Sequence, residues 1–473
     1  MGSNQRENFR LGERCNIKSS KRIFAREYVE HGIPFWRSKD VIDKSLGVFQ
    51  HFDLFISEER YNEIAQKFGS PQKGDLLISS VGNRSGQPYI VQDEGDFYFK
   101  DGNILWANNF VNLDAEFLAY WLKSPKGQSA LSSVMIGSAQ KAITIDALRT
   151  LEVSFPPYHA QIEAVRTLKQ LDSKIALNRQ INQTLEQMAQ TLFKSWFVDF
   201  DPVMDNSLDT GNPIPDELQH RAEARKVVRE SEGFKPLPDE VRQLFPDAFE
   251  ESELGWVPKG WGVSTAGDEF TVKGGSTPST KNAEFWEGGD IHWTSPKDLS
   301  GKAEKIMLDT ERKITAAGLK KITSGLLPEN SVLMSSRAPI GYLALAKIPV
   351  AINQGYIAIP STTRLSQEYA LYWLDSSIDE IKGIAGGTTF AEISKHTFKS
   401  IKMIVPDSKV TDIFSNLAKG YLDKITLNVK EVATLTKLRD TLLPKLISGE
   451  LRLDEVELAV NQETVSAEQQ NER

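Results

Sequence analysis

Apolar residues return at alternating intervals of three and four positions through the stretch from Ala160 to Phe197, which holds neither glycine nor proline. Leu168 and Ile175 are typical members of the series. The spacing predicts one long helix, about 54 Å at 1.5 Å per residue, with the narrow apolar seam of a coiled coil. Proline cannot continue a helix, so Pro202 is expected to end it.

The same pattern occurs again 250 positions later in the chain. The gapless matches include Lys174 with Lys424, Ile175 with Ile425, Asn178 with Asn428, Leu185 with Leu435 and Leu192 with Leu442. Because duplicated segments usually approach a two-fold relation, the two helices are expected to pack antiparallel, seam to seam. Asn178 and Asn428 fall on or beside this seam, where they either fix its register or lie at its edge in solvent.

The repeat extends beyond the helices, in runs that read as short strands, turns and helices. The matching pairs, in chain order, are IPFWRSKDV from Ile33 with IHWTSPKDL from Ile291, LLISS from Leu76 with VLMSS from Val332, EFLAYWL from Glu116 with EYALYWL from Glu368, and GSAQKAITIDALRTLEVSFP from Gly137 with GTTFAEISKHTFKSIKMIVP from Gly387. Four matches in the same order predict a tandem duplication of a globular domain plus a helix.

The predicted fold class is therefore α+β, with two globular domains of mixed α/β structure separated by two long antiparallel coiled-coil helices. The expected segments are domain 1 at 1–158, spacer helix 1 at 159–200, an acidic Pro-rich linker at 201–262, domain 2 at 263–408, spacer helix 2 at 409–450 and a polar, disordered tail at 451–473. A length of 473 residues agrees with several domains.

Charge is distributed unevenly along the chain, although its net value is −8. Residues 199–254 hold 15 acidic and 6 basic side chains, and residues 449–473 hold 7 and 2. The rest of the chain is therefore net basic, which is compatible with nucleic-acid binding. The single Cys15, and the absence of a signal-peptide pattern or a long apolar run, predict a cytoplasmic protein.

No motif in the sequence indicates a catalytic site. FPPY from Phe155 resembles the loop that grips the base in amino-methyltransferases, but Phe155 lacks the hydrogen-bond acceptor of that loop. A Pro-Pro break before the long helix explains it better. No GxxxxGK[ST] phosphate loop, HExxH pair or complete nuclease motif is present. The chain is therefore expected to recognise a ligand without transforming it, and no metal site is predicted.

Candidate DNA-binding residues are small hydroxyl, amide and cationic side chains at matching places in the two globules, because such groups contact phosphates and base edges. In the first copy they are Lys18, Ser19, Lys21, Arg22, Trp36, Arg37, Lys39, Ser80, Asn83, Arg84, Gln140 and Lys141. In the second copy they are Lys273, Ser276, Thr277, Trp293, Thr294, Lys297, Ser336, Arg337, Thr388 and Thr389. Each residue alone is an ordinary turn or surface residue, and the prediction depends on their recurrence.

Large aromatic residues follow the first helix, at Trp196, Phe197 and Phe200. They either bind a partner protein or pack on the chain's own second globule or helix. The sequence leaves both alternatives open.

The chain resembles the specificity subunits of Type I restriction-modification enzymes. The strings that carry the resemblance are LFKSWFVDFDPV from Leu192, FPDAFEESELGWVPKGW from Phe245, KGGSTP from Lys273 with WEGGDIHW from Trp286, and LLPKLISGELRL from Leu442. They span almost the whole chain, and their combination is highly specific.

The resemblance implies a non-catalytic targeting subunit whose two target recognition domains each read one half of a gapped double-stranded DNA sequence. It implies two modification subunits, which hold S-adenosylmethionine and methylate adenine N6, and two restriction subunits, which use ATP and Mg²⁺, with no cofactor in this chain. Two alternatives belong to other classes. One is a self-sufficient methyltransferase or nuclease, and the other is a coiled-coil scaffold or DNA-binding protein of a silent or non-restriction system.

Overall fold

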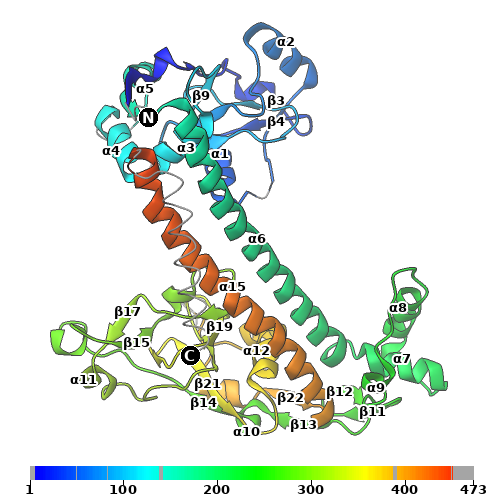
Figure 1. Ribbon diagram of the computed structural model, residues 1–473. Coiled ribbons are helices and arrows are strands. Elements are labelled where there is room, and N and C mark those ends of the chain that lie inside the picture. The colour runs from blue at the N-terminus through cyan, green and yellow to red at the C-terminus, as the bar shows by residue number, and fades with distance from the viewer. Residues whose placement is uncertain are drawn as a thin grey trace. The chain divides into compact units, whose positions relative to one another are not determined.

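The computed structural model describes residues 6–49, 51–82, 84–137, 142–386, 391–448 and 450. The chain divides into two compact units: the described residues of Met1–Ile175 with Thr434–Arg473, and Ala176–Ala433. Helices α6 (Tyr158–Phe197) and α15 (Ser408–Ser448) each contribute one part to either unit (Figure 1). Both long helices are thus confirmed, within a few residues of their expected ends.

Sheets and short helices make up the globular part of the first unit. Its strands are β1 (Glu7–Arg10), β2 (Asn16–Lys18), β3 (Tyr28–Val29), β4 (Ile33–Trp36), β5 (Phe55–Ile56), β6 (Leu76–Ser79), β7 (Pro88–Ile90), β8 (Tyr98–Phe99), β9 (Ile104–Asn108) and β10 (Glu152–Phe155). Its short helices are α1 (Ser38–Leu46), α2 (Glu58–Phe68), α3 (Ala115–Lys123), α4 (Pro125–Val134) and α5 (Ile145–Thr150). Hydrogen bonds order the strands as β2-β9-β6-β7, β3-β5-β4-β8 and the ribbon β1-β10.

The core of the first unit joins this globule to the helix pair. The ring of Phe155 makes edge contacts with Phe117 and Trp121, each at a centroid distance of 5.2 Å. The same apolar cluster holds Leu168 from α6 and Leu442 from α15. Burying a side chain of this kind stabilises the fold by roughly 1.5–3 kcal/mol. The first part of α6 therefore packs against the last part of α15, as an antiparallel pair requires.

The second unit repeats this plan with more strands. Its strands are β11 (Phe249–Ser252), β12 (Gly255–Pro258), β13 (Gly262–Thr265), β14 (Phe270–Lys273), β15 (Ile291–Thr294), β16 (Ile306–Met307), β17 (Arg312–Ile314), β18 (Ser331–Ser335), β19 (Leu343–Ala346), β20 (Ala351–Ile352), β21 (Tyr356–Thr362) and β22 (Lys402–Val405). Its helices include α7 (Asp201–Thr210), α8 (Gln219–Arg229), α9 (Asp239–Arg242), α10 (Ala266–Glu269), α11 (Ala316–Leu319), α12 (Gln367–Ser376), α13 (Ile378–Gly383) and α14 (Lys395–Lys399). The main sheet has the order β14-β21-β18-β19-β16.

The matching strings of the sequence fold into matching elements, which confirms the duplication. The antiparallel ribbon β1-β10 corresponds to β13-β22. Strand β4 corresponds to β15, β6 to β18, and helix α3 to α12. Each copy therefore begins and ends at one two-stranded ribbon, from which a long helix leaves.

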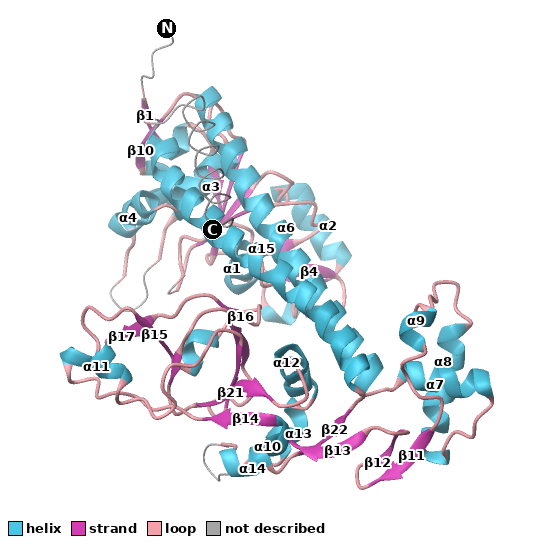
Figure 2. Cartoon of the chain, turned by 60° about the horizontal axis from the view of Figure 1, so that its bottom comes forward, coloured by secondary structure: helices cyan, strands magenta, loops and turns pink. Residues whose placement is uncertain are grey.

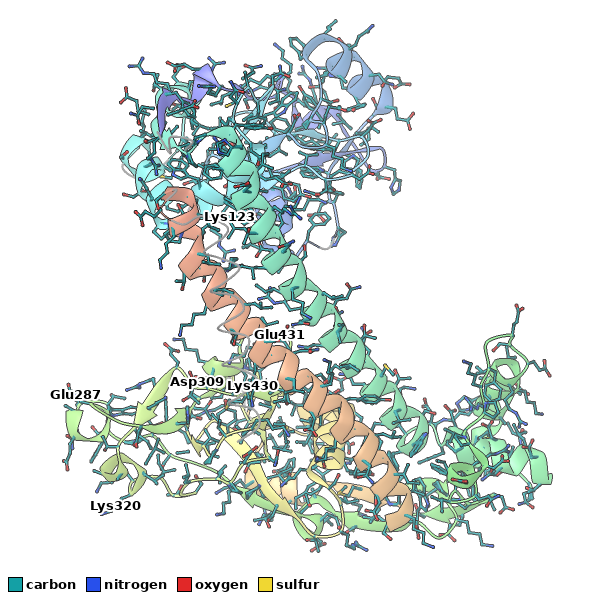
Figure 3. All side chains as sticks on the ribbon, viewed as in Figure 1. Lys123, Glu287, Asp309, Lys320, Lys430 and Glu431 are labelled. Carbon is teal, nitrogen blue, oxygen red and sulfur yellow. The ribbon has the colours of Figure 1, made fainter. Side chains whose placement is uncertain are left out.

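A polar layer interrupts the apolar seam within the second unit. Asn178 donates a hydrogen bond from Nδ2 to Oε2 of Glu431, at 2.8 Å, and Asn428 donates one to Oδ1 of Asn182, also at 2.8 Å. Glu431 is labelled on α15 in Figure 3. Asn178 and Asn428 are only 2% and 1% exposed. Both lie inside the seam, where sliding one helix along the other would leave buried amides unpaired.

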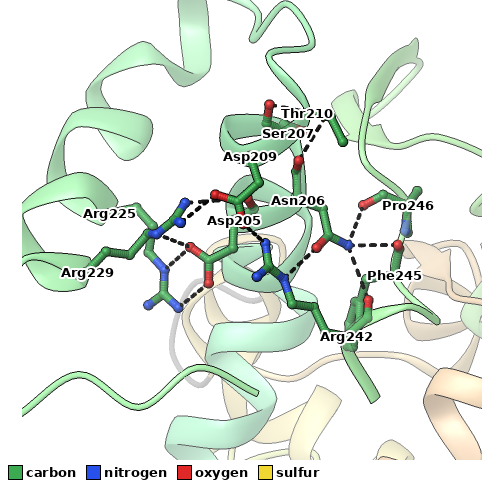
Figure 4. Close-up of polar contacts among 10 residues, drawn as sticks. All are labelled: Asp205, Asn206, Ser207, Asp209, Thr210, Arg225, Arg229, Arg242, Phe245 and Pro246. Atoms are coloured by element: carbon green, nitrogen blue, oxygen red, sulfur yellow. Dashed lines mark hydrogen bonds and ion pairs between the residues drawn. The ribbon is translucent and has the colours of Figure 1, made fainter. Parts of the chain in front are cut away.

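Residues 201–262 correct the prediction of an acidic linker, because they fold. Figure 2 shows α7, α8 and α9 together with the β11-β12 hairpin. Asp205 accepts hydrogen bonds from Nε and Nη2 of Arg225, at 2.9 and 2.7 Å. Asp209 pairs with Arg229, at 2.5 Å, and with Arg242 (Figure 4). Helix α6 already ends at Phe197, so Pro202 lies in the first turn of α7 and does not terminate α6. The predicted tail, 451–473, lies outside the described residues.

Candidate nucleic-acid interface

A buried serine closes the loop that follows strand β6. Ser79 donates a hydrogen bond from Oγ to the carbonyl oxygen of Arg84, at 2.8 Å, and accepts one from the backbone N–H of Gln87, at 3.1 Å. These side-chain bonds add to the backbone hydrogen bonds that Ser79 keeps with Gln87 and Gly86, at 3.0 and 2.7 Å. Arg84, whose carbonyl oxygen accepts from the hydroxyl, has an exposed side chain.

The equivalent serine in the second unit makes the same two hydrogen bonds. Ser335, at the end of β18, donates from Oγ to the carbonyl oxygen of Pro339, at 2.7 Å, and accepts from the N–H of Tyr342, at 2.8 Å. Arg337 lies in this loop, with its side chain 39% exposed. The two copies thus keep one loop framework and change the side chains on it.

Each serine loop lies beside a second loop. The carbonyl oxygen of Ser80 accepts a hydrogen bond from the N–H of Ile143, at 2.9 Å, and that of Ser336 accepts one from Ile393, at 3.0 Å. In each copy the structure therefore joins the serine that follows the strand to an isoleucine 57 or 63 positions further along the chain, a contact that the sequence did not indicate. The predicted residues Asn83, Gln140, Lys141, Thr388 and Thr389 lie outside the described residues.

Matching aspartates cap the turn after β4 and β15. Asp40 accepts a hydrogen bond from the N–H of Arg37, at 2.6 Å, and Asp298 accepts one from the N–H of Ser295, at 2.9 Å. The carboxylates satisfy N–H groups that have no partner at a helix start. They also position the exposed residues Lys39 and Lys297, and their capping role was missed although the sequence matched them.

Three of the predicted cations of the first unit contact an aromatic ring or a carboxylate. Lys18 has its Nζ 3.8 Å from the ring centre of Trp106, and burial lowers the pKa of Lys18. Lys21 has its Nζ 5.4 Å from the ring centre of Phe68. Arg22 is paired with Asp101 at 2.9 Å. Lys21 and Arg22 are exposed, so both can exchange these contacts for a phosphate.

Arg37 is more firmly held than these three. Its guanidinium pairs with Asp40, at 3.2 Å, and with Asp53, at 2.8 Å. The hydrogen bonds that the guanidinium donates to both carboxylates raise the pKa of Arg37. Two carboxylates neutralise its charge, which makes it a weaker phosphate ligand than the exposed Lys39.

The cations of the second unit have polar partners of their own. Lys273 donates from Nζ to the carbonyl oxygen of Ser324, at 3.4 Å. Lys297 pairs with Glu311, at 3.0 Å, and is 75% exposed. Exposed pairs of this kind contribute little free energy, so the ammonium group of Lys297 can exchange Glu311 for another anion at low cost.

Small hydroxyls of the predicted site hold the loops together. Ser19 donates to the carbonyl oxygen of Ile104, at 3.0 Å, and Ser276 donates to that of Lys321, at 2.9 Å. Thr277 donates from Oγ1 to Gln354, at 2.7 Å. Ser19 and Ser276 thus hydrogen-bond to backbone carbonyl groups. Thr277 and its partner Gln354 have exposed side chains that a ligand can contact.

Five predicted DNA-binding residues are buried, and the structure assigns them to the loop framework. They are Trp36, Ser80, Trp293, Thr294 and Ser336, none more than 5% exposed. The Trp36 ring stacks on Phe97 with centroids 3.9 Å apart. Alternation along a strand allows either face to carry the tryptophan, and packing places it inside.

Trp196, Phe197 and Phe200 pack on the chain's own second globule. The Trp196 ring meets Phe245 at 5.1 Å, and the rings of Phe197 and Phe200 lie 6.0 and 5.8 Å from Trp261. None of the three is more than 6% exposed. The structure therefore contradicts the alternative that these residues bind a partner protein, since their buried rings have no surface left for a partner.

The sequence did not indicate that Arg312 stacks on Trp286. The guanidinium carbon of Arg312 lies 3.4 Å from the ring centre of Trp286 and 5.6 Å from that of Trp293. No match between the copies marks Arg312, so the repeat gave no signal for it. A stacked guanidinium keeps its edge available for phosphate or base contacts.

Within the part of the chain that the structure describes, no group of His, Cys, Asp and Glu side chains has the arrangement of a metal site. Nor does any helix of the described residues have the length and apolar character needed to cross a membrane.

The duplicated α/β fold, with matching polar loops on both copies, defines the class of two-part recognition proteins. The chain belongs to the family of the Type I restriction modification DNA specificity domain, whose model matches residues 4–187 and 258–434. The two matched ranges correspond to the two copies of the repeat.

One known specificity subunit is similar over most of the chain, and another over less than half of it. The HindI specificity subunit of Haemophilus influenzae is 29% identical over 404 residues, which cover 80% of this chain and 87% of that protein. The MjaIX specificity subunit of Methanocaldococcus jannaschii is 35% identical over 200 residues, or 42% of this chain and 46% of that protein. A solved structure, the Type I restriction-modification system S subunit from M. genitalium, matches with a TM-score of 0.57 at 15% identity, covering 94% of this chain and 97% of that chain, and is similar in fold.

Proposed function

We propose that this chain is the DNA-recognition subunit of a Type I restriction-modification complex, and that each globule reads one half of a gapped double-stranded target. The observation that carries the proposal is the pair of loops closed by Ser79 and Ser335, with identical hydrogen bonds and different side chains. One framework with two sets of side chains suits an asymmetric target.

Cations on these loops and caps would bind phosphates and fix the position of each globule on DNA. We assign this role to the exposed Lys39, Arg84 and Lys297, and to the half-buried Arg337, which would exchange its ion pair with Glu392, at 3.8 Å, for a phosphate. Phosphate contacts position a protein on DNA, and groove contacts specify the sequence. Base reading is assigned to the predicted residues Gln140, Lys141, Thr388 and Thr389, which lie outside the described residues.

The chain would act without catalysing a reaction. Modification subunits would bring S-adenosylmethionine and methylate adenine N6, after the base leaves the duplex stack. Restriction subunits would use ATP and Mg²⁺ to cleave unmethylated DNA. The helix pair α6 and α15, with helices of 40 and 41 residues, would serve as the spacer between the half-sites.

Methylation mapping tests the proposal. Methylated adenines would be mapped across a host genome with this gene and its neighbours, and again after deletion of this gene alone. A gapped two-part motif that disappears with the deletion is expected. An unchanged pattern, with the partner subunits verified as expressed, would contradict the proposal and favour the scaffold alternative.

Single substitutions then test the two loops separately. Arg84→Ala is expected to weaken or relax recognition of one half of the motif, and Arg337→Ala that of the other half. Base-specific contacts contribute about 1–3 kcal/mol to discrimination, whereas loss of a phosphate contact weakens binding uniformly and lowers its salt dependence. The two outcomes separate base reading from phosphate binding at each arginine.

A further inference from the structure

Arg312 and Trp286 form a stacked pair on the second unit. The guanidinium carbon of Arg312 lies 3.4 Å from the centre of the Trp286 ring. A guanidinium that pointed a nitrogen at the ring from this distance would overlap the ring atoms, so the group lies flat on the indole. A flat guanidinium directs its N–H donors sideways, within one plane. Trp286 therefore fixes the plane in which Arg312 can donate hydrogen bonds.

A hydrogen bond and a second tryptophan hold the Trp286 indole in place. Nε1 of Trp286 donates to the carbonyl oxygen of Ser279, at 3.1 Å. The Trp293 ring meets Trp286 edge to face, with centroids 5.1 Å apart and planes at 87°. Trp293 is itself buried and donates from Nε1 to the carbonyl oxygen of Ser276, at 3.4 Å. The loop that follows β14 and the string WEGGDIHW thus build one support for Arg312.

The N–H donors of the Arg312 guanidinium have no acceptor among the described residues. The side chain is exposed, and within the described chain it takes part in no ion pair or side-chain hydrogen bond. By contrast, Arg22, Arg37 and Arg337, which the sequence placed in the interface, each pair with a carboxylate. Stacking therefore positions Arg312 and leaves its hydrogen-bonding capacity for a ligand.

The stacked pair lies beside residues already predicted to bind DNA. Arg312 on β17 stands opposite Trp293 on β15 in the antiparallel register (Figure 1). Glu311, the preceding residue, pairs with Lys297, at 3.0 Å. Arg312 falls outside the strings that match between the two copies, so it belongs to the side chains in which the globules differ. Such a residue suits the reading of one half-site and not of both.

Local charge favours a base edge over a phosphate as the ligand. Residues 282–290, which carry Trp286, contain Glu284, Glu287 and Asp290 and no Lys or Arg. All three carboxylates are exposed, so they repel a phosphate that approaches this segment. The O6 and N7 atoms of guanine are uncharged acceptors, and their spacing fits two N–H groups of one arginine.

We propose that Arg312 reads a guanine in the half of the target that the second globule binds. Two N–H groups along one edge of its guanidinium would donate to O6 and N7 in the major groove, while Trp286 keeps the plane of the group fixed. This pre-organisation lowers the entropy that the side chain loses on binding. The inference rests on the proposed function and adds a specificity residue that the repeat did not mark.

Methylation mapping with substituted full-length chains tests this assignment. The host carries the gene with its neighbours, and the wild type defines the motif. Arg312→Ala is expected to relax one guanine, in one half of the motif only. Arg312→Gln is expected to shift the same position towards adenine, because a Gln amide pairs with N6 and N7 of adenine. A loss of stability would instead lower methylation at every site alike.

Binding to duplex DNA gives the magnitude of the effect. The purified complex is mixed with fluorescent duplexes that carry the mapped motif, with or without that guanine. The wild type is expected to prefer the guanine duplex about tenfold or more, the effect of one bidentate contact. Arg312→Ala should bind both duplexes equally. Trp286→Leu removes the stacking surface but keeps the arginine, so it should reduce the preference at the same position by a smaller factor.

Lys313→Ala is the matched control. Lys313 is the next residue on β17, its side chain is 43% exposed, and its ion pair with Asp309 is long, at 4.0 Å. Because strand neighbours point to opposite faces, Lys313 does not share the position of Arg312 on Trp286. Its removal takes one positive charge from the same strand and is expected to leave the motif unchanged.

Three outcomes would overturn the assignment. They are an unchanged motif in both Arg312 variants, a uniform fall of methylation without a change of base preference, and the same relaxation in Lys313→Ala. The second outcome, with a lower salt dependence of binding, would identify a phosphate contact instead. A wild type that produces no two-part motif contradicts the proposed function itself, whereas a two-part motif that both Arg312 variants leave intact contradicts only the role of Arg312.

Discussion

Matching tyrosines attach the two globules to α6 in two different settings. Tyr120 donates its O–H to Oδ2 of Asp172, at 2.7 Å, in the first unit. Tyr372 donates to Oε2 of Glu186, at 3.3 Å, in the second. The tyrosines occupy the same place in EFLAYWL and EYALYWL, but the two carboxylates are not repeat equivalents. Duplication preserved the hydroxyl, and each copy found its own acceptor on the helix.

Each tyrosine, its carboxylate and a cation paired with that carboxylate form a group called an anchor here. The cations of the two anchors differ in position and exposure more than the tyrosines do. Asp172 pairs with Arg439 of α15, at 2.9 Å, and the two side chains are 37% and 29% exposed. Glu186 pairs with Lys305 of the globule, at 2.6 Å, and both side chains are 15% exposed. The comparison teaches that equivalent geometry does not imply equal energy, because water screens the first pair and is largely excluded from the second.

The largest expected effect is that of Lys305→Met in the buried anchor. Lys305 also pairs with Asp375, at 2.9 Å, so its loss leaves two carboxylates without their cation. We expect the free energy of unfolding of the second unit to fall by roughly 3 kcal/mol. Calorimetry or urea unfolding of the full chain measures this fall. Lys302→Met, at an exposed lysine three residues away, is the control and should change little.

The second largest loss of stability is expected from removal of the Tyr120 hydroxyl. Tyr120→Phe deletes the shorter of the two hydrogen bonds, and a bond to a charged acceptor contributes about 1.5–3 kcal/mol. We expect a loss of about 1.5 kcal/mol, and a smaller one for Tyr372→Phe, whose bond is longer. Thermal unfolding of both variants decides the order. A larger loss in Tyr372→Phe would show that burial outweighs bond length.

Alkaline pH should weaken both anchors together. Burial raises the pKa of Tyr120 and Tyr372 above the ordinary value near 10, with the nearby carboxylates acting in the same direction. Below pH 10 both tyrosines keep their hydroxyl protons in the folded and the unfolded chain, so their full contribution to stability is present. Above it the unfolded chain loses the proton first, so stability falls by about 1.4 kcal/mol per pH unit for each tyrosine until the folded pKa is reached.

Unfolding measured between pH 9 and 11 tests this dependence. The variant Tyr120→Phe lacks one of the titrating groups and should lose stability less steeply than the wild type. Equal slopes in the two proteins would contradict the raised pKa of Tyr120.

The comparison of the anchors also marks what sequence can reveal. Periodicity gave both long helices, and repeated strings gave the duplication, because these signals are local or recur at a fixed offset. The partners of the tyrosines were hidden, since Tyr372 and Glu186 lie 186 positions apart. Nothing in the sequence around Glu186 indicates that Lys305 is its ion-pair partner.

The same limit explains the errors in the candidate site and the linker. Trp36 and Trp293 were correctly matched, but only packing shows that they face inward. Asp205 and Asp209 were counted as solvated charge, whereas arginines 20 to 33 positions away neutralise them. Pairing in space, and not the local charge count, decides whether such a segment folds.

The smallest expected effect is that of Arg439→Met, and it sharpens the comparison most directly. Asp172 is more than a third exposed and keeps the hydrogen bond from Tyr120, so water and one hydroxyl remain to stabilise its charge. We expect the free energy of unfolding to fall by about 0.5 kcal/mol, and the loss to shrink at high salt. Unfolding in 0.1 M and 1 M salt, beside Lys305→Met, measures the contrast. A loss as large as that of Lys305→Met, and insensitive to salt, would mean that the first anchor is as well shielded from water as the second.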